Sequence, residues 1–324
     1  MRLIIKKSIL TFMALSCAFF VSAQQMPIYS QYSMYNPAIA GADGYTTISL
    51  TSRDEWVGFD NSPKTYVLSI QGRLLRRDYQ IKNNPLSKGK MLFKRSGRVG
   101  LGALVFNDHN GVIDRTGAQV TYAYHIFINT TTQLSFGLAA STFQFKIAQD
   151  KLSFRDQEPL LNEAFSNKVL IPDVTFGLHV LTPNSYAGLS VANLFQSRIN
   201  IGSQNNYDYR LYRNYFLMAG KCFHEEHPFS YEPSILLKAT EKMIFQADIQ
   251  MRAYYNRDYY MGLCYRTGSA IGTMIGVRWD RLYFSYVFEY SLTKLQKYTF
   301  GSHEVNIALK LGDSARRYKW LIRY

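Results

Sequence analysis

Residues 244–311 read IFQADIQMRAYYNRDYYMGLCYRTGSAIGTMIGVRWDRLYFSYVFEYSLTKLQKYTFGSHEVNIALKL, and this stretch decides the fold. Apolar and polar side chains alternate along five runs within it. In the first run, Ile249, Met251 and Ala253 alternate with Asp248 and Gln250. Period-two alternation predicts β-strands with one apolar and one polar face. Each run is roughly 9–11 residues long, the length that a tilted strand needs to cross a bilayer.

Very short turns join the first four of these strands: Asn256-Arg257, Thr267-Gly268-Ser269 and Asp280. A soluble β-sandwich also alternates, and it is the alternative fold. Sandwich strands are usually shorter, and five long strands with aromatic ends favour an outer-membrane barrel. Barrel strands present apolar residues to lipid, aromatic girdles to the two interfaces and polar residues to the lumen.

The composition agrees with a barrel. The 324-residue chain contains 25 Tyr, and aromatic residues make up 15% of it. Beyond the N-terminus no stretch of 18 apolar residues occurs, so we expect no transmembrane helix. The formal net charge of +14 raises the question of nucleic acid. For an exported barrel, anionic lipopolysaccharide or an acidic partner explains that charge better, and we expect no nucleic-acid partner.

The N-terminus, residues 1–23, has the three parts of a Sec signal peptide. These are a basic region, an apolar core and a small-residue cleavage site: Arg2, Lys6 and Lys7, then residues 9–20, then Val21-Ser22-Ala23. We therefore expect export, cleavage before Gln24 and residence in the outer membrane of a Gram-negative cell. A lipobox around Cys17 fits poorly, because Leu15 stands at the wrong offset.

The whole chain can be divided in the same way. Residues 24–43 are polar and turn-rich and are expected to form a periplasmic lead-in, residues 44–312 the barrel, and residues 313–324 a basic tail. The expected strands are 44–53, 63–73, 98–107, 115–127, 131–146, 172–181, 185–193, 211–222, 230–239, 244–254, 258–266, 270–279, 281–290 and 303–312. The prediction is therefore an all-β protein: a single antiparallel transmembrane β-barrel of about 14 strands, closed so that no edge meets lipid.

Residues 74–97 form a long connection where this topology predicts a short periplasmic turn. The connection is strongly basic, with Arg76, Arg77, Lys82, Lys88, Lys90, Lys94 and Arg95 opposed within it by Asp78 alone. Three interpretations are open. The connection is a charged segment exposed to solvent, or a periplasmic surface that docks an acidic partner, or, if the strand count is wrong, a loop that contacts lipopolysaccharide.

The inward-facing positions of the last five strands carry both signs of charge: Asp248, Arg252, Arg266, Arg278, Glu289, Glu304 and Lys310. Opposite charges across a lumen can satisfy one another structurally. They can also line a selective pore or a cavity for a polypeptide.

Signals for enzyme chemistry are weak, and we expect no catalytic residue, cofactor or metal. His224 and His227 are three residues apart, whereas a zincin helix places its histidines four apart. Ser302 and His303 are adjacent on an extended chain and point to opposite faces, so they cannot pair as nucleophile and base. Cys222 and Cys264 lie in separate strands and are expected to remain free thiols.

Several short motifs, in this order, resemble the PorP/SprF family of the Bacteroidetes type IX secretion and gliding machinery. The family's opening Asn-Pro-Ala…Ala-Gly element is similar to Asn36-Pro37-Ala38…Ala40-Gly41, and its Arg-x-x-Trp-x-Gly…Pro-x-Thr element to Arg53, Trp56, Gly58, Pro63 and Thr65. Further matches are Tyr186 to Ser190, Glu232-Pro233-Ser234 with Lys238, Gly262 to Arg266, and Gly301-Ser302-His303-Glu304. The segment from Leu282 to Glu289 departs from the family's usual Gly-Tyr-Ser-Tyr-Asp.

The resemblance implies a non-catalytic outer-membrane barrel that supports export or surface anchoring of a large secreted protein, including gliding adhesins. It also implies contacts with other type IX components. The leading hypothesis is that the barrel binds the C-terminal region of the secreted protein. These motif residues also have a purely structural explanation. Asn36, Pro37 and Gly41 are residue types that favour turns, and Trp56 would be part of an aromatic girdle or anchor a loop. A diffusion channel or small-molecule transporter is the alternative function, and lipid hydrolysis is a third.

Overall fold

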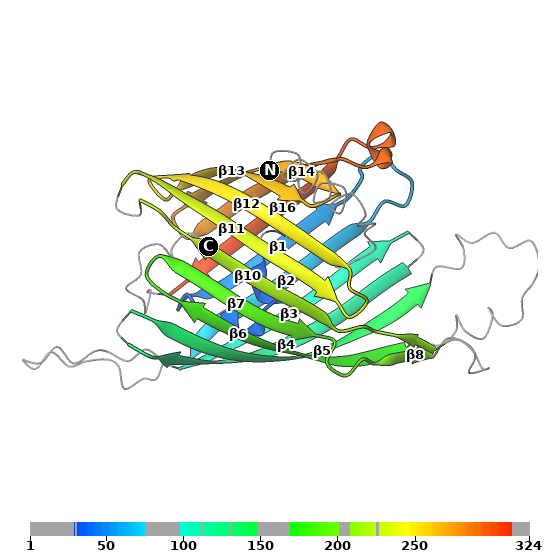
Figure 1. The fold of residues 1–324 in the computed structure, drawn as a ribbon, viewed down its shortest axis with the longest axis horizontal. Coiled ribbons are helices and arrows are strands. Elements are labelled where there is room, and N and C mark those ends of the chain that lie inside the picture. The colour runs from blue at the N-terminus through cyan, green and yellow to red at the C-terminus, as the bar shows by residue number, and fades with distance from the viewer. Residues whose placement is uncertain are drawn as a thin grey trace, which may run out of the picture.

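Fourteen strands close into one antiparallel barrel in the computed structural model (Figure 1). The structure describes Tyr29 and residues 31–74, 98–111, 113–129, 131–147, 169–200, 208–224 and 227–312. The barrel strands are β1 Thr46–Asp54, β2 Lys64–Leu74, β3 Val99–Asn110, β4 Ile113–Phe127, β5 Gln133–Ile147, β6 Val169–Leu181, β7 Ser185–Ala192, β10 Asn214–Lys221, β11 Phe229–Thr240, β12 Phe245–Tyr255, β13 Tyr259–Arg266, β14 Ala270–Trp279, β15 Leu282–Ser291 and β16 Ser302–Leu311. The predicted fold class and the strand count are confirmed.

Neighbouring strands in the chain are neighbours in the wall, and β1 closes the barrel against β16. The closing register runs from Thr46 opposite Leu311 to Asp54 opposite His303. Closure removes the free sheet edges, whose unpaired backbone groups lipid cannot satisfy. A separate two-stranded ribbon, β8 (Arg198–Asn200) with β9 (Asp208–Arg210), stands outside the wall sequence.

The outer face of the wall is apolar and the inner face is polar. Ile249, Leu263 and Ile275 point outward and are 47%, 60% and 52% exposed. Residues between them on the same strands point inward and are buried, as Asp248 and Arg266 show. The alternation read from the sequence therefore corresponds to a lipid face and an interior face. Among the described residues, no helix is long and apolar enough to cross a membrane.

Two strand starts differ from the prediction by three residues, the largest differences at any strand start. β6 begins at Val169 rather than at 172, because Val169, Leu170 and Ile171 continue the ladder with β5 across from Phe145, Gln144 and Phe143. β10 begins three residues later than predicted, at Asn214, where its pairing with β7 and β11 starts. In both cases the partner strand, which lies elsewhere in the sequence, decides the boundary.

The two ends of the barrel are unlike. One end, the short-turn end, carries the connections 128–132, 182–184, 256–258 and 280–281. The other, the loop end, carries residues 55–63, the β8–β9 ribbon and residues 292–301 with the 3-10 helix η5 (Lys294–Tyr298), all of which are toward the right in Figure 1. Outer-membrane barrels keep their short turns in the periplasm, so the short-turn end is taken as the periplasmic one.

Candidate functional site

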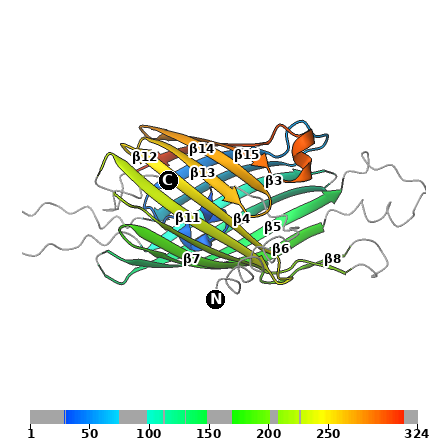
Figure 2. The same ribbon diagram turned by 45° about the horizontal axis from the view of Figure 1, so that its top comes forward.

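The interior of the barrel is occupied by the chain's own N-terminal part. Tyr29 and residues 31–45, here called the inner segment, lie inside the wall and include the 3-10 turns η1 (Tyr32–Met34) and η2 (Pro37–Ile39), blue in Figure 2. η2 packs against β4, β5 and β6. We expected residues 24–43 to precede the barrel as a periplasmic lead-in. The described part of that lead-in instead lies within the barrel.

Asn36 anchors the inner segment on one side of the wall. Its side chain caps η2, where Oδ1 accepts from the Ala38 N–H at 3.0 Å. Its Nδ2 donates to the backbone oxygens of Leu178 on β6 at 2.8 Å and Leu189 on β7 at 3.3 Å. Pro37 occupies the first position of η2, where its missing N–H costs nothing. This motif therefore both turns the chain and fastens it to the wall.

Glycines on the facing strands make room for η2. A Cβ atom on Gly137 would lie 2.1 Å from the Ala38 nitrogen, and one on Gly177 would lie 2.1 Å from Asn36 Oδ1. At Gly100 it would lie 2.0 Å from the backbone oxygen of Ala40. A real Cβ atom does not come this close to its neighbours, so the inner segment fits only because these three inward-facing positions have no side chain.

The opposite side of the wall holds the inner segment by charge. The interior charge cluster comprises three basic and four acidic side chains, most of them almost fully buried: Arg53, Lys238, Arg266, Glu55, Asp248, Glu289 and Glu304. Arg53 contacts Glu55 at 3.0 Å, Glu304 at 3.3 Å and Glu289. Buried charges of this kind are tolerated only when paired and hydrogen-bonded.

Arg266 extends this cluster across neighbouring strands. Its Nε lies 3.0 Å from Asp248 and its Nη1 3.4 Å from Glu289, while Lys238 Nζ lies 3.0 Å from the other oxygen of Asp248. The cluster thus links β1, β11, β12, β13, β15 and β16.

Tyr29 joins the inner segment to the cluster. Its backbone N–H donates to the Glu304 carboxylate at 3.1 Å, and its hydroxyl donates to Glu289. The Arg266 guanidinium lies 4.9 Å from the centre of its ring. Burial raises the pKa of the Tyr29 phenol well above its usual value, so the group remains a neutral donor. The inner segment is therefore fastened at two separate places, Tyr29 on one wall and Asn36 on another.

The loop end brings together two motifs that are far apart in the sequence. The Trp56 N–H donates to Ser302 Oγ at 3.1 Å, and the Val57 N–H donates to the Gly301 oxygen at 2.8 Å. A Cβ atom on Gly58 would lie 2.8 Å from the Phe300 ring. Residues 55–63 and 299–304 thus form one unit, the loop-end joint, above the β1–β16 closure. Pro63 completes it by accepting from the Glu55 N–H at 2.8 Å.

The remaining candidate residues separate into three groups. Arg252, Arg278 and Lys310 lie in the half of the barrel nearer the short-turn end, and Gly41 lies where the inner segment passes Gly72. The basic residues Arg76, Arg77, Lys82, Lys88, Lys90, Lys94 and Arg95 lie outside the described residues. β2 ends and β3 begins at the short-turn end, so the connection that carries them starts and finishes there.

Ser302 and His303 face opposite sides of the wall. Ser302 points inward to the Trp56 N–H, and His303 points outward and hydrogen-bonds to the Tyr286 hydroxyl at 2.7 Å. No group of three or more potential metal ligands occurs in the part of the chain that the structure describes. Cys222 and Cys264 are both buried, and neither forms a disulfide within the described residues.

Sequence reasoning missed several residues that hold the inner segment. Arg73 on β2 points inward and donates to the backbone oxygen of Ala42 at 3.4 Å and to Gln133 at 3.0 Å. His125 on β4 contacts the Ala40 oxygen at 3.0 Å, and Ser190 on β7 donates to the Tyr35 oxygen at 2.7 Å. One signal was available: glycines recur at inward positions of consecutive strands, where a lumen filled by wall side chains would carry larger residues.

Fold and interior together define a closed outer-membrane-type β-barrel whose lumen is occupied by its own N-terminal segment. A family-level comparison matches residues 21–309 to the type IX secretion system membrane proteins PorP/SprF. The chain belongs to this family, and family and fold agree on an outer-membrane location. No curated protein matches the chain.

Solved structures resemble the chain in fold at low identity. The CymD monoaromatic hydrocarbon channel is 11% identical with a TM-score of 0.50, and the match covers 93% of this chain and 97% of that one. The Ralstonia pickettii toluene transporter TbuX is 12% identical with a TM-score of 0.48, covering 86% and 92%. Outer membrane phospholipase A from Escherichia coli is 10% identical with a TM-score of 0.34, covering 86% and 98%. At such identities the likeness concerns the fold alone.

Proposed function

We propose that this protein is a non-catalytic accessory barrel of the type IX secretion system that supports export or surface anchoring of a large secreted protein, such as an adhesin. Membership of the PorP/SprF family supports a role in type IX secretion. The observation that carries the proposed accessory role is the inner segment, which lies inside the barrel and is fastened to both sides of the wall. A barrel whose lumen is filled by its own inner segment is better suited to holding a secreted protein than to forming a wide pore.

The loop end is the surface that we assign to the secreted client. Phe59, Tyr298 and Phe300 are exposed there, with Phe300 79% accessible. The loop-end joint holds their loops on the barrel closure, so an aromatic surface is presented on a rigid base. Anchors of this type carry much of the binding energy in protein interfaces. The client segment that we propose is the C-terminal region of the secreted protein.

The short-turn end is the surface that we assign to other secretion components. The connection between β2 and β3 carries an excess of basic residues and begins at that end. Such a surface attracts an acidic partner, and the attraction weakens as salt rises. Outer-membrane lipids and lipopolysaccharide would contact the apolar outer face and its aromatic rims. Sec export with cleavage after Ala23 would deliver the chain, and gliding motility in a Bacteroidetes cell is one setting for the client.

Deletion of the gene tests the proposal directly. Proteins on the cell surface and in the medium are compared by mass spectrometry between the deletion strain and a strain complemented with the wild-type gene. Loss of one or a few large surface proteins, with other exports intact, is the expected result. Loss of all type IX cargo would make this a core component instead. An unchanged set of exported proteins would overturn the proposal.

Conductance distinguishes the holder from the alternative, a diffusion channel or small-molecule transporter. Wild-type protein in planar bilayers should show little current, because the inner segment occupies the lumen. A variant in which Tyr29 and residues 31–41 are replaced by a flexible Gly/Ser stretch should conduct. Steady wide-pore current from the wild type would favour the channel.

A further inference from the structure

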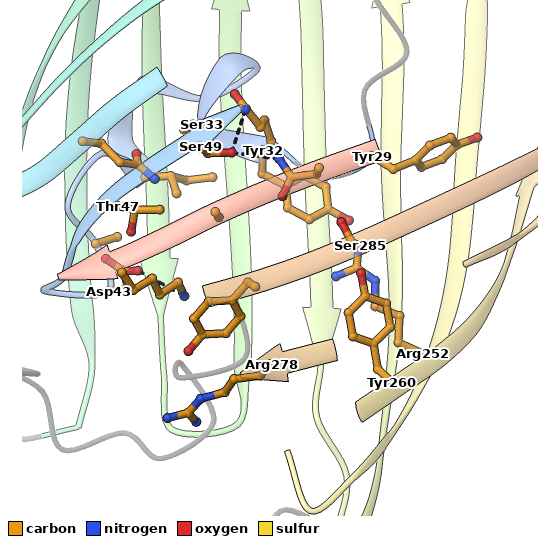
Figure 3. Close-up of a pocket in the computed structure, with 18 of the residues that line it drawn as sticks. Tyr29, Tyr32, Ser33, Asp43, Thr47, Ser49, Arg252, Tyr260, Arg278 and Ser285 are labelled. Atoms are coloured by element: carbon orange, nitrogen blue, oxygen red, sulfur yellow. Dashed lines mark hydrogen bonds and ion pairs between the residues drawn. The ribbon is translucent and has the colours of Figure 1, made fainter. Parts of the chain in front are cut away.

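A cavity of about 170 Å³ lies between the inner segment and the wall, in the half of the barrel nearer the short-turn end. Figure 3 shows Asp43, Thr47 and Arg278 toward one side of it and Arg252 and Tyr260 toward the other. Arg257 and Asp258, which also line the cavity, belong to the 256–258 turn, so it opens toward the short-turn end. None of the proposed secretion contacts uses this space.

Three side chains in one row of the wall point into the cavity. Thr47 on β1 is opposite Gln71 on β2 and also opposite Lys310 on β16. Thr47 Oγ1, Gln71 Oε1, Lys310 Nζ and, from the inner segment, Gln31 Oε1 are buried atoms without a hydrogen-bond partner in the described part of the chain. All four of their residues line the cavity. Buried polar groups ordinarily find partners, so these four atoms could each bind a polar group placed in the cavity.

The buried ammonium of Lys310 favours an anionic ligand in the cavity. The residue is 4% exposed, and its ammonium lies 3.6 Å from the Asp43 carboxylate, beyond ordinary hydrogen-bond length. The ring centre of Tyr283 lies 4.7 Å from the same nitrogen. An ammonium carries three N–H donors, and a buried one is costly without acceptors. Among all lining residues, four are cationic and two are acidic: Arg252, Arg257, Arg278 and Lys310 against Asp43 and Asp258.

The side chains of Gln31, Gln71 and Thr47 indicate which other hydrogen-bonding groups the ligand should carry. The two Gln oxygens require donors, and the Thr47 hydroxyl takes either role. Tyrosine rings complete the lining: Tyr29, Tyr32, Tyr186, Tyr254, Tyr260 and Tyr283. An empty cavity of about 150 Å³ accommodates benzene, so this one has room for a single ring. The occupant should be one ring that carries an anion and several hydroxyl donors.

We propose that this cavity binds a monomeric sugar acid that enters from the short-turn end. The carboxylate accepts hydrogen bonds from Lys310, the ring hydroxyls donate to Gln31 and Gln71, and a hydroxyl exchanges a hydrogen bond with Thr47. The C–H face of the sugar packs against the tyrosine rings. Asp43 remains beside Lys310 and shares its ammonium with the ligand.

The test uses full-length protein purified in detergent and titrated calorimetrically with D-galacturonate, D-galactose and acetate. Galacturonate should bind saturably and at least about tenfold more tightly than galactose, which has the same ring without the charge; acetate, which lacks the ring, should bind no better than galactose. Lys310→Met should weaken galacturonate binding about 10- to 100-fold, as expected for loss of a charge-assisted hydrogen bond. Lys64→Met, an exposed position on β2, is the matched control and should leave the affinity unchanged.

Equal affinity for galacturonate and galactose would overturn the proposal, as would a folded Lys310→Met protein with wild-type affinity. Absence of saturable binding by the wild type would mean that the cavity holds water alone. Acetate binding as tightly as galacturonate would reduce the site to a carboxylate subsite without sugar recognition. Folding of each variant is checked by heat-modifiable electrophoretic mobility. If Lys310→Met does not fold, the galacturonate–galactose comparison on the wild type still decides.

Discussion

Replacing Gly137 with alanine should displace the inner segment while leaving the wall intact. The added Cβ would lie 2.1 Å from the Ala38 nitrogen, 2.3 Å from the Pro37 carbonyl carbon and 2.5 Å from the Ala38 Cα. Optimal separations between carbon atoms are about 3.5–4.0 Å, so η2 must move by more than about 1 Å. The atoms that collide belong to the backbone and cannot rotate away. Gly137 pairs with Ala123 and Gly177 through its own backbone, which the substitution leaves in place.

The expected magnitude follows from the cost of overpacking. Extra methyl groups in well-packed sites cost about 1–3 kcal/mol. Every 1.4 kcal/mol is a tenfold change in an equilibrium constant, so the ratio of displaced to seated inner segment should rise about 5- to 150-fold. Because the segment fills the lumen, the same change should appear as a larger fraction of open time in planar bilayers.

Gly102→Ala is the matched control. Gly102 also faces inward, on β3, but its added Cβ would meet its nearest neighbours at 3.5 Å, an ordinary contact. Both variants should show the heat-modifiable mobility of a folded barrel, and only Gly137→Ala should gain conductance and protease sensitivity in the inner segment. Identical behaviour of Gly137→Ala, Gly102→Ala and the wild type would refute the reasoning that the bare wall at Gly137 seats the segment.

Three further predictions concern the wall, the interior charges and the basic connection. Ile307→Arg places a charge on the lipid face and should cost about 2–4 kcal/mol in denaturant unfolding from lipid vesicles; an unchanged transition would contradict the assigned face. Arg53→Met leaves Glu289 and Glu304 buried without their main cation and should cost about 3–5 kcal/mol. Arg213→Met, which removes a partly exposed ion pair, should cost under about 1 kcal/mol. Equal losses would mean that water screens the charges of the cluster. Neutralising the basic residues of 74–97 should weaken co-purification of secretion components and leave barrel insertion intact; normal co-purification would remove the docking role.

The wall was predictable because its information is local. Polar and apolar residues alternate along each strand, as Asp248 and Ile249 do, and short turns separate the strands. This local pattern predicts which side chains face lipid without any knowledge of the strand's partners. The same property explains why the strand boundaries were less accurate. Val169 belongs to β6 because β5 continues opposite it, and the residues of β5 stand more than 20 positions earlier.

The candidate site was predictable only as a set of residue types. Arg53 and Glu304 stand far apart in the sequence and meet because β1 closes against β16. Their signs of charge could be read from the chain, but their pairing with Glu289 and Tyr29 could not. The basic connection remains a sequence-based prediction, since its residues lie outside the described ranges.

The sequence by itself determined that the chain forms a barrel, which face of each strand meets lipid and which charges point inward. Only the tertiary structure decided what fills the interior. Gly100, Gly137 and Gly177 leave one hollow, and Thr47, Gln71 and Lys310 surround another, only after the wall has curved into a closed ring. A hollow is a property of surfaces that face one another across the lumen, so residues on well-separated strands must be placed in space before it exists.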